Sequence, residues 1–372
     1  MESVHWNLDG GNSGHLFCLK RAHAHLHRSA RGVGTRMSIN CRWAYVVDLF
    51  VNCRSDTKAE NRWVGLRNSI SSLVNRKFIS HSILMALKYS INQLIFKKLE
   101  EFAPLVLAES WDNVGILVEP ENEVDISKIL ITNDLTHRVM NEAISKNVQM
   151  IISYHPPIFT PIKHIRQSYW KESLITKCIK RDIYVYSPHT ALDSVNGGIN
   201  DWILSEFNIQ FKEPIETNKN LNPAPDGGDK IIHGSGRYCE LKNPISLSIA
   251  IEVLKRRFML KDLLLAKSHK NLDVNELSIN TIAVCPGSGQ SLFKILQKRA
   301  DLWVTGEMSH HELLDATENV ETPTSVILTA GHSNSERGFL VDVYQPWLKK
   351  ELKNYNVEVI ISDSDSDPLI VV

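Results

Sequence analysis

The chain has 372 residues, of which 43% are hydrophobic and 23% are charged. This composition is typical of globular proteins, and the length is sufficient for two domains. Lysine plus arginine number 42, as do aspartate plus glutamate, so no net charge attracts nucleic acid or an anionic membrane. No apolar run approaches the ~20 residues that cross a bilayer. We therefore expect a globular protein with no direct nucleic-acid ligand and no membrane partner.

The cysteines favour a reducing compartment. All six lack a CxxC partner and a dense spacing, which argues against a disulfide framework and against a cysteine-ligated zinc site. A cytoplasmic location is expected on this ground.

Residues 1–84 differ in composition from the rest of the chain. Between Asp9 and Asp48 there is no acid, but there are six basic residues: Lys20, Arg21, Arg28, Arg31, Arg36 and Arg42. An Arg-rich, acid-poor N-terminus is typical of a mitochondrial transit segment. The alternative is an unstructured leader upstream of the true initiator, with Met37 or Met85 as the start. Both interpretations make residues 1–84 an extension of the folded core.

Hydrophobic spacing predicts a first α/β domain over residues 85–212. From Ser82 to Leu99, apolar residues recur mostly at intervals of three and four, as on an amphipathic helix. Further predicted elements alternate in type: a strand at 128–133, a helix at 136–146, a strand at 148–153, a helix at 169–180 and a strand at 183–187. Such alternation predicts a parallel sheet covered by helices.

A proline- and glycine-rich linker at 213–230 is predicted to precede a second α/β domain over residues 231–372. The alternation of types repeats there. Strands are predicted at 281–285, 302–305, 325–329 and 357–361, and helices at 246–258, at 290–299, from His310 and from Asn334. The fold class is therefore α/β.

Polar residues that directly follow predicted strands are candidate site residues, because ligands of α/β proteins gather where strands end. His155 follows the strand at 148–153. Pro156 and Pro157 stiffen the chain there, so its imidazole loses little freedom on binding an ion. The alternative for this histidine is an ordinary hydrogen bond.

His189 and Asp193 follow the strand that ends at Ser187. The two oxygens of Asp193 can each meet a cation, so this carboxylate can bridge two metal ions. The polar and glycine residues at 194–198 also favour an Asx turn, in which Asp193 has no ligand role.

His332 and Glu336 follow the strand at 325–329. Residues four apart share one face of a helix, so the pair can bind one ion. Ser333 and Glu336 also match the S-x-x-E capping box, in which Glu336 satisfies only backbone donors. Both interpretations fit the sequence.

His310 and His311 lie within a second S-x-x-E pattern, Ser309–Glu312, which predicts that they are in the first turn of a helix. Together with His189, they are candidates for moving protons or for supporting the ligands of a site.

The three strand-end segments together offer two imidazoles and two carboxylates: His155, Asp193, His332 and Glu336. This mixture suits zinc, manganese or iron. Two such ions about 3.5–4 Å apart lower the pKa of a bridging water and polarise a carbonyl or phosphoryl oxygen. If the segments converge, they predict hydrolytic chemistry. The loop at 286–291 can also offer backbone amides to an anion, but it lacks the lysine of a P-loop, and a tight glycine turn is the competing interpretation.

Five motifs give residues 85–372 a specific resemblance. They are ESWDNVG (109–115), SYHPP (153–157), SPHTALD (187–193), TGEMSHH (305–311) and GHSNSERG (331–338). In this order they resemble the motifs of the NIF-three-like family, also called GTP cyclohydrolase I type 2 homologues. The match leaves residues 1–84 unexplained.

The resemblance implies two related α/β domains with mixed sheets flanked by helices, and a metal site at the domain interface. It implies two divalent ions per chain, with ligands His155, Asp193, His332 and Glu336. Bacterial members have a histidine where this chain has Tyr154, which leaves open whether Tyr154 binds an ion. Family members also form homo-oligomers, and eukaryotic ones are linked to protein partners in transcriptional corepression, which adds the nucleus as a location. The candidate functions are a metal-dependent hydrolase of unknown substrate, a non-enzymatic corepressor partner and a GTP ring-opening enzyme.

Overall fold

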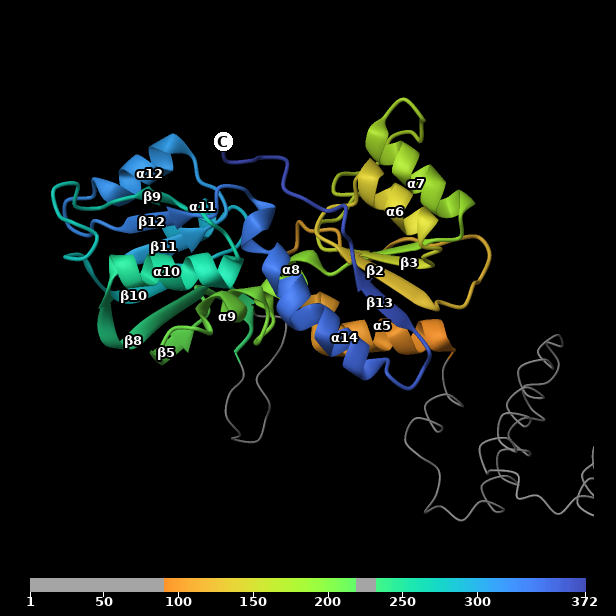
Figure 1. Cartoon of the computed structure of the whole chain (residues 1–372), viewed down its shortest axis with the longest axis horizontal. Coiled ribbons are helices and arrows are strands. Elements are labelled where there is room, and N and C mark those ends of the chain that lie inside the picture. Colours follow the sequence, from red (N-terminus) through yellow and green to blue (C-terminus); the bar gives the residue numbers. More distant parts are fainter. Residues whose placement is uncertain (1–89, 219–231) are drawn as a thin grey trace, which may run out of the picture. The chain divides into compact units, whose positions relative to one another are not determined.

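The computed structural model describes residues 90–218 and 232–372 (Figure 1). All of them belong to one compact unit, Ser80–Val372. The predicted extension at 1–84 and residues 219–230 of the predicted linker lie outside the described residues.

The first sheet has the strand order β1-β4-β3-β2-β13. Four of its strands run parallel, and β1 pairs antiparallel with β4 at one edge. The strands are β1 (Gly115–Val118), β2 (Lys128–Thr132), β3 (Met150–Ser153), β4 (Tyr184–Ser187) and β13 (Glu358–Ile361). The three central strands confirm the predicted ones, whereas β1 was not predicted from the sequence.

Strand β13 corrects the predicted domain order. The sequence predicts this strand but assigns it to the second domain, whereas in the structure it pairs with β2 and completes the first sheet. Val359 on β13 pairs with Ile129 of β2, and both side chains are buried in one apolar cluster. The last strand of the chain therefore belongs to the first sheet, although the strands of the second sheet precede it in sequence.

Helices cover both faces of the first sheet (Figure 1). Side chains of β2 alternate between the faces: Leu130 packs with residues of α6 and α7, whereas Ile129 and Ile131 pack with residues of α5 and α14. The helices are α5 (Ile91–Phe102), α6 (His137–Ser145), α7 (Trp170–Lys180) and α14 (Gln345–Glu351). Ser90 and Gln93 form a capping box at the start of α5, so the predicted amphipathic helix is confirmed from Ile91 onward.

The second sheet has the strand order β5-β8-β10-β11-β12-β9. Its centre is parallel, and β5, β8 and β9 pair antiparallel at the edges. The strands are β5 (Ile209–Glu213), β8 (Arg237–Ser246), β9 (Leu264–Ala266), β10 (Ser278–Val284), β11 (Leu302–Thr305) and β12 (Ser325–Leu328). A short ladder joins β6 (Glu216–Thr217) to β7 (Gly234–Ser235).

Helices also cover the second sheet on both faces. Residues of α9 and α10 pack in the large core, whereas α11 and α12 pack on the opposite face. Their bounds are α9 (Ile199–Leu204), α10 (Leu247–Phe258), α11 (Gln290–Lys294) and α12 (His310–Thr317). The helix predicted at 290–299 is shorter than expected: it ends at Lys294, and Phe293 is its one buried residue.

A long regular helix was predicted from Asn334, and this prediction is wrong because the segment is divided into four short pieces. The segment consists of a 3₁₀ turn (Ser333–Ser335), α13 (Arg337–Phe339), a π-helical turn (Leu340–Tyr344) and α14. Proline has no N–H and clashes with the carbonyl four residues earlier, so Pro346 at the start of α14 cannot continue a regular helix, and the π-helical turn precedes it. His332 and Glu336 therefore do not share the face of a long α-helix.

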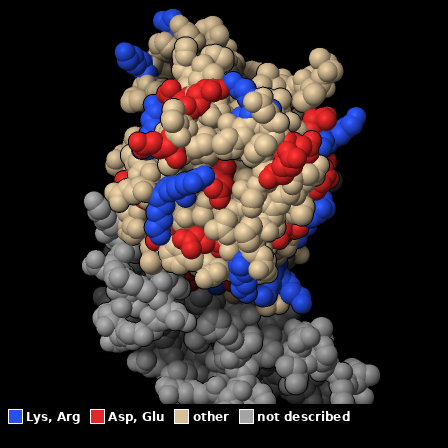
Figure 2. Space-filling view, turned by 90° about the vertical axis from the view of Figure 1, so that its left-hand side faces the viewer, with Lys and Arg blue, Asp and Glu red and all other residues tan. Residues whose placement is uncertain are grey.

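One apolar cluster extends through both sheets, from Ile152 of the first to Val304 of the second. The protein is thus a mixed α/β fold with mixed sheets flanked by helices. Within residues 90–218 and 232–372, no helix has the length and apolar character of a membrane span. On the face shown in Figure 2, basic and acidic side chains are intermingled rather than segregated.

Candidate metal centre

Loops that follow parallel strands of both sheets meet at one place. Asn133 follows β2, His155 follows β3 and His332 follows β12. Asn133 Nδ2 donates to Oε2 of Glu336 over 2.9 Å, which joins the two sets of loops directly. The convergence that the sequence could only assume is therefore present for these residues.

His155, His332 and Glu336 form the centre of the site. Their nitrogen and oxygen ligand atoms all lie within 4.8 Å of one another. Nε2 of His155 lies 3.4 Å from Oε2 of Glu336, and Nε2 of His332 lies 3.6 Å from Oε1 of the same carboxylate. These separations are longer than ordinary N–H···O hydrogen bonds. The two imidazoles therefore approach one carboxylate at distances that leave room for a cation between them.

The environment of His155 fits a metal ligand. Its Nδ1 lies 2.9 Å from Oδ1 of Asp134, and a carboxylate can only accept, so Nδ1 carries a proton. Its Nε2 is buried and has no hydrogen-bond partner. In the neutral imidazole, the lone pair of Nε2 faces the Glu336 carboxylate, so either a proton or a cation must lie between the two groups. A divalent cation satisfies both groups at once.

The electrostatics of the cluster also favour positive charge. Burial alone would lower the pKa of His155, but the carboxylates of Glu336 and Asp134 outweigh it and raise that pKa well above its usual value. Burial would raise the pKa of Glu336, but the imidazoles of His155 and His332 outweigh it and lower that pKa. The cluster thus holds an ionised carboxylate in a buried position that attracts a cation.

Three imidazoles share one arrangement, in which Nδ1 is bound to a carboxylate. Nδ1 of His332 lies 2.8 Å from Glu307, and Nδ1 of His189 lies 2.8 Å from Asp112, as His155 does from Asp134. Such carboxylates orient a metal-binding histidine and leave its Nε2 free to bind. None of the three acids was predicted from the sequence as a site residue. Asp112 lies in the motif ESWDNVG and Glu307 in the motif TGEMSHH, which is the signal that could have identified them.

Glu336 has no capping role. Its carboxylate is 1% exposed and accepts from Asn133 rather than from the backbone of its own turn. No side-chain cap precedes this turn. At Ser309, in contrast, the hydroxyl accepts from the backbone N–H of Glu312, as the capping pattern predicts. The two S-x-x-E patterns therefore have different outcomes.

Asp193 lies in α8 (His189–Ser194) and its Oδ1 accepts a 2.7 Å hydrogen bond from the Tyr154 hydroxyl. The Asx turn is not formed. Burial raises the pKa of Asp193 to about 7, although the His189 and His155 imidazoles oppose this shift. Burial and the Asp193 carboxylate raise the pKa of Tyr154 well above its usual value, so the phenol stays protonated and acts as a donor.

His189 lies beside the cluster, with its ring centroid 5.4 Å from that of His155 and 5.3 Å from that of Tyr154. Its backbone has a φ of 26°, which few non-glycine residues adopt.

His310 and His311 are exposed in the first turn of α12, and their ring centroids lie 5.5 Å apart. The catalytic roles predicted for these three histidines stay predictions, with His189 the one placed next to the cluster.

The glycine loop packs against the cluster. Gly287 has a φ of 66°, and a Cβ there would lie 2.7 Å from Nε2 of His332 and 2.9 Å from Oε1 of Glu336. The N–H of Gly287 donates to Ser335, and that of Gly289 donates to Thr305. Because the protein itself uses these amides, the tight-turn interpretation of the loop fits better than phosphate binding.

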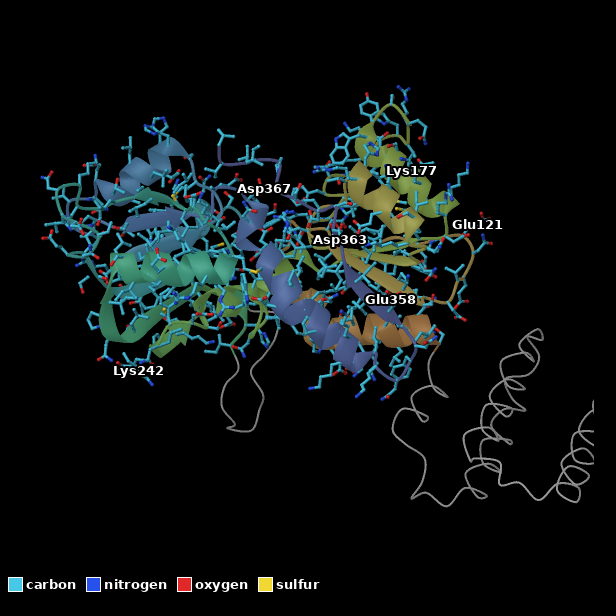
Figure 3. All side chains as sticks on the ribbon, in the orientation of Figure 1. Glu121, Lys177, Lys242, Glu358, Asp363 and Asp367 are labelled. Carbon is cyan, nitrogen blue, oxygen red and sulfur yellow. The ribbon has the colours of Figure 1, made fainter. Side chains whose placement is uncertain are left out.

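The C-terminal segment, residues 362–368, ties the two halves of the site together. Asp365 accepts from the backbone N–H of Asn133 over 2.8 Å and pairs with Arg337 at 3.3 Å. Asp367 accepts from the hydroxyl of Ser333 over 3.0 Å. Figure 3 shows the labelled Asp363 and Asp367 along this segment, between the two sheets.

A family model described as Duf34/NIF3 (NGG1p interacting factor 3) matches residues 91–368. The chain belongs to the Duf34/NIF3 family. The matched residues include both sheets and every member of the cluster, so the resemblance drawn from the five motifs is confirmed.

Relatives of this Duf34/NIF3 chain occur in both eukaryotes and bacteria. It is 46% identical over 279 residues to the NIF3-like protein 1 of Drosophila melanogaster, covering 75% of this chain and 88% of that protein. It is 35% identical over 286 residues to the NGG1-interacting factor 3 of Saccharomyces cerevisiae, covering 74% of this chain and 96% of that protein. The crystal structure of a Bacillus cereus protein related to NIF3 matches with a TM-score of 0.62 and 21% identity, covering 75% and 98% of the two chains, which supports the fold alone.

Proposed function

We propose that this Duf34/NIF3 protein is a divalent-metal-dependent hydrolase of unidentified substrate. His155, His332 and Glu336 bind one ion, and Asp193 supplies the carboxylate for a second ion beside it. Zinc, manganese and iron suit this set of nitrogen and oxygen donors. The observation that carries the proposal is the buried, unpartnered Nε2 of His155, which faces the Glu336 carboxylate at 3.4 Å.

A bound ion of this kind lowers the pKa of water and polarises a carbonyl or phosphoryl oxygen. The residues of the chain supply the remaining functions. Asp134 and Glu307 hold the imidazoles of His155 and His332 in the orientation that exposes Nε2. His189 accepts or delivers a proton at its Nε2 in this proposal, which is supported by the 2.8 Å contact of its Nδ1 with Asp112. His310 and His311, which are exposed in the first turn of α12, are further candidates for this role.

Tyr154 orients Asp193. Its hydroxyl donates to Oδ1, which leaves Oδ2 as the oxygen best placed to meet an ion. The phenol is 1% exposed, so water does not compete for this hydrogen bond. The second ion would therefore be held by fewer protein ligands than the first, and we expect it to bind more weakly.

The proposal is tested by measuring metal content and hydrolysis together. Purified protein is loaded with Zn²⁺, Mn²⁺ or Fe²⁺, dialysed and analysed for bound metal, then assayed on a panel of phosphate esters and cyclic amides. His155→Ala and Glu336→Ala should lose the tight ion and any hydrolysis. His164→Ala is the matched control, because His164 also pairs with a carboxylate, Glu172, at 2.9 Å but at an exposed site.

A wild-type protein that holds no metal after loading would overturn the metal site. Full metal retention in Glu336→Ala would overturn the ligand assignment. Metal binding without hydrolysis of any ester or amide would overturn the enzymatic part alone.

A second candidate function is a non-enzymatic interaction protein in transcription. The name of the yeast relative, NGG1-interacting factor 3, favours it. Asp193→Ala and Glu336→Ala separate the candidates in cells that depend on this chain: loss of function with an intact fold favours chemistry, whereas retained function favours a protein-binding role. The homo-oligomer and the cytoplasmic, mitochondrial or nuclear locations stay predictions. The N-terminal extension, on which the mitochondrial location rests, lies outside the described residues.

GTP ring opening is the third candidate and has a direct assay. Metal-loaded protein incubated with GTP should release formate if the ring is opened hydrolytically. Absence of formate, with the metal shown to be bound, removes this candidate.

A further inference from the structure

Two large aromatic side chains are exposed beside the metal centre. Trp111 is 60% exposed and Phe159 is 46% exposed, although aromatic residues of this size usually contribute to a core or an interface. Their rings contact each other edge to face, with centroids 6.0 Å apart. We call these two residues the aromatic platform.

The platform adjoins the cluster through His189. The His189 ring centroid lies 6.3 Å from that of Trp111 and 6.4 Å from that of Phe159. The centroid of the same imidazole also lies 5.4 Å from that of His155. A ligand of modest length can therefore cover the platform with one end while its other end reaches the candidate ion.

The platform is held in place before any ligand binds. The loop of Trp111 and the loop of Phe159 are joined by a hydrogen bond of 2.6 Å from Nδ2 of Asn113 to the carbonyl of Ile158. Asp112, next to Trp111, accepts from the N–H of Thr190 over 3.1 Å as well as binding His189. Little conformational entropy is lost when such a surface is covered, so its apolar area is available for binding.

We propose that the aromatic platform binds a planar aromatic or heteroaromatic ring of the ligand whose polar group meets the metal. This proposal rests on the proposed function. Ring faces attract other rings through offset-stacked and edge-to-face contacts, and a Trp beside a Phe offers both a face and an edge. An extended apolar chain would gain burial without these contacts, so the exposed ring pair favours a planar group.

Exposure alone does not make a platform. Trp170 is 51% exposed, yet its neighbours are the His137 ring at 6.2 Å and the Lys171 ammonium at 5.6 Å, away from the cluster. Trp170 therefore supplies a matched control for an exposed tryptophan that does not adjoin the candidate ion.

The test uses two hydroxamates that bind metal through the same group. Benzohydroxamate carries a ring and acetohydroxamate carries a methyl group. With the zinc-loaded full chain, calorimetric titration should give benzohydroxamate an affinity at least about tenfold higher. Trp111→Ala combined with Phe159→Ala should reduce this ratio to near one and leave the affinity for acetohydroxamate unchanged. Trp170→Ala should keep the wild-type ratio.

Each remaining outcome has a defined meaning. A ratio near one in the wild type, or a high ratio that survives in the double variant, overturns ring recognition. A double variant that changes the mass of the particle in light scattering but not the ratio shows a self-association surface instead, which also overturns it. If the wild type holds no metal, the proposed function fails by itself. Ring contact is then tested by saturation-transfer NMR with benzohydroxamate, where equal signals from wild type and double variant overturn the platform.

Discussion

Asn133 Nδ2 donates to Oε2 of Glu336 over 2.9 Å, although the two residues are 203 positions apart in the chain. The donor follows β2 of the first sheet, and the acceptor follows β12 of the second. Both side chains are buried, so the bond is shielded from water. It fixes the Glu336 carboxylate next to the imidazoles of His155 and His332, and it links the loops that follow the two sheets.

Asn133→Ala should lower the free energy of unfolding by about 1–3 kcal/mol, because it leaves a buried carboxylate without a donor. The measurement is urea unfolding in the presence of EDTA, which keeps metal out of the comparison. Asn122→Ala is the control, since Asn122 donates to Asp182 at an exposed position. If both variants lose the same free energy of unfolding, the Asn133–Glu336 bond contributes no more to stability than an exposed hydrogen bond.

Asp134→Asn and Glu307→Gln should each weaken metal binding about 10- to 100-fold, because each removes the carboxylate that orients a ligand imidazole. Competition with a fluorescent zinc chelator measures the affinity. Glu172→Gln, beside the exposed His164, should leave the affinity unchanged. Unaltered zinc affinity in both site variants would mean that these carboxylates do not support the ligands.

Glu142→Gln should remove a pH-dependent part of the stability. The Glu142 carboxylate accepts from Ser362 and from the N–H groups of Asp363 and Ser364, so it anchors the C-terminal segment to α6. Burial would raise the pKa of Glu142, but these bonds and the Lys146 ammonium outweigh it and lower that pKa to about 2. A lowered acid pKa stabilises the fold fully above pH ~4.5.

This contribution of Glu142 disappears as the pH falls from about 4.5 toward 2. Thermal unfolding across that range should show wild type and Glu142→Gln converging at the acid end and diverging near neutrality. Glu358→Gln, an exposed partner of Lys128 on β13, is the control. A constant gap between Glu142→Gln and wild type would contradict the expected linkage.

Asp201→Ala should be strongly destabilising, by about 3–5 kcal/mol, because it leaves the Arg237 guanidinium buried without its counter-ion. Arg237 is 1% exposed, and its Nη2 lies 3.0 Å from Oδ2 of Asp201. Urea unfolding measures the loss. Glu252→Ala, from an exposed pair with Lys255, should cost at most about 1 kcal/mol. If the two variants lose similar free energies of unfolding, the Asp201–Arg237 pair contributes no more than an exposed ion pair, which would contradict the prediction.

Most helices and strands were determined by the local sequence. In β2 and β3 the apolar residues are continuous, and in α10 they recur with the helical period, so burial could be inferred without knowing the partner. His155, His332 and Glu336 could be selected for a similar reason. Each lies in a segment that follows a predicted strand, which is where ligands gather in this class of fold.

The tertiary structure decided how distant segments combine. β13 joins the first sheet, where Val359 pairs with Ile129 of β2. Asp112, Asp134 and Glu307 bind an imidazole only because the fold places a histidine from another loop beside each of them. An acid in a loop has the same local pattern whether it binds water or orients a histidine. A hydrogen bond such as that between Asn133 and Glu336 forms because the fold brings the two side chains together. Their separation of 203 residues along the chain does not predict this contact.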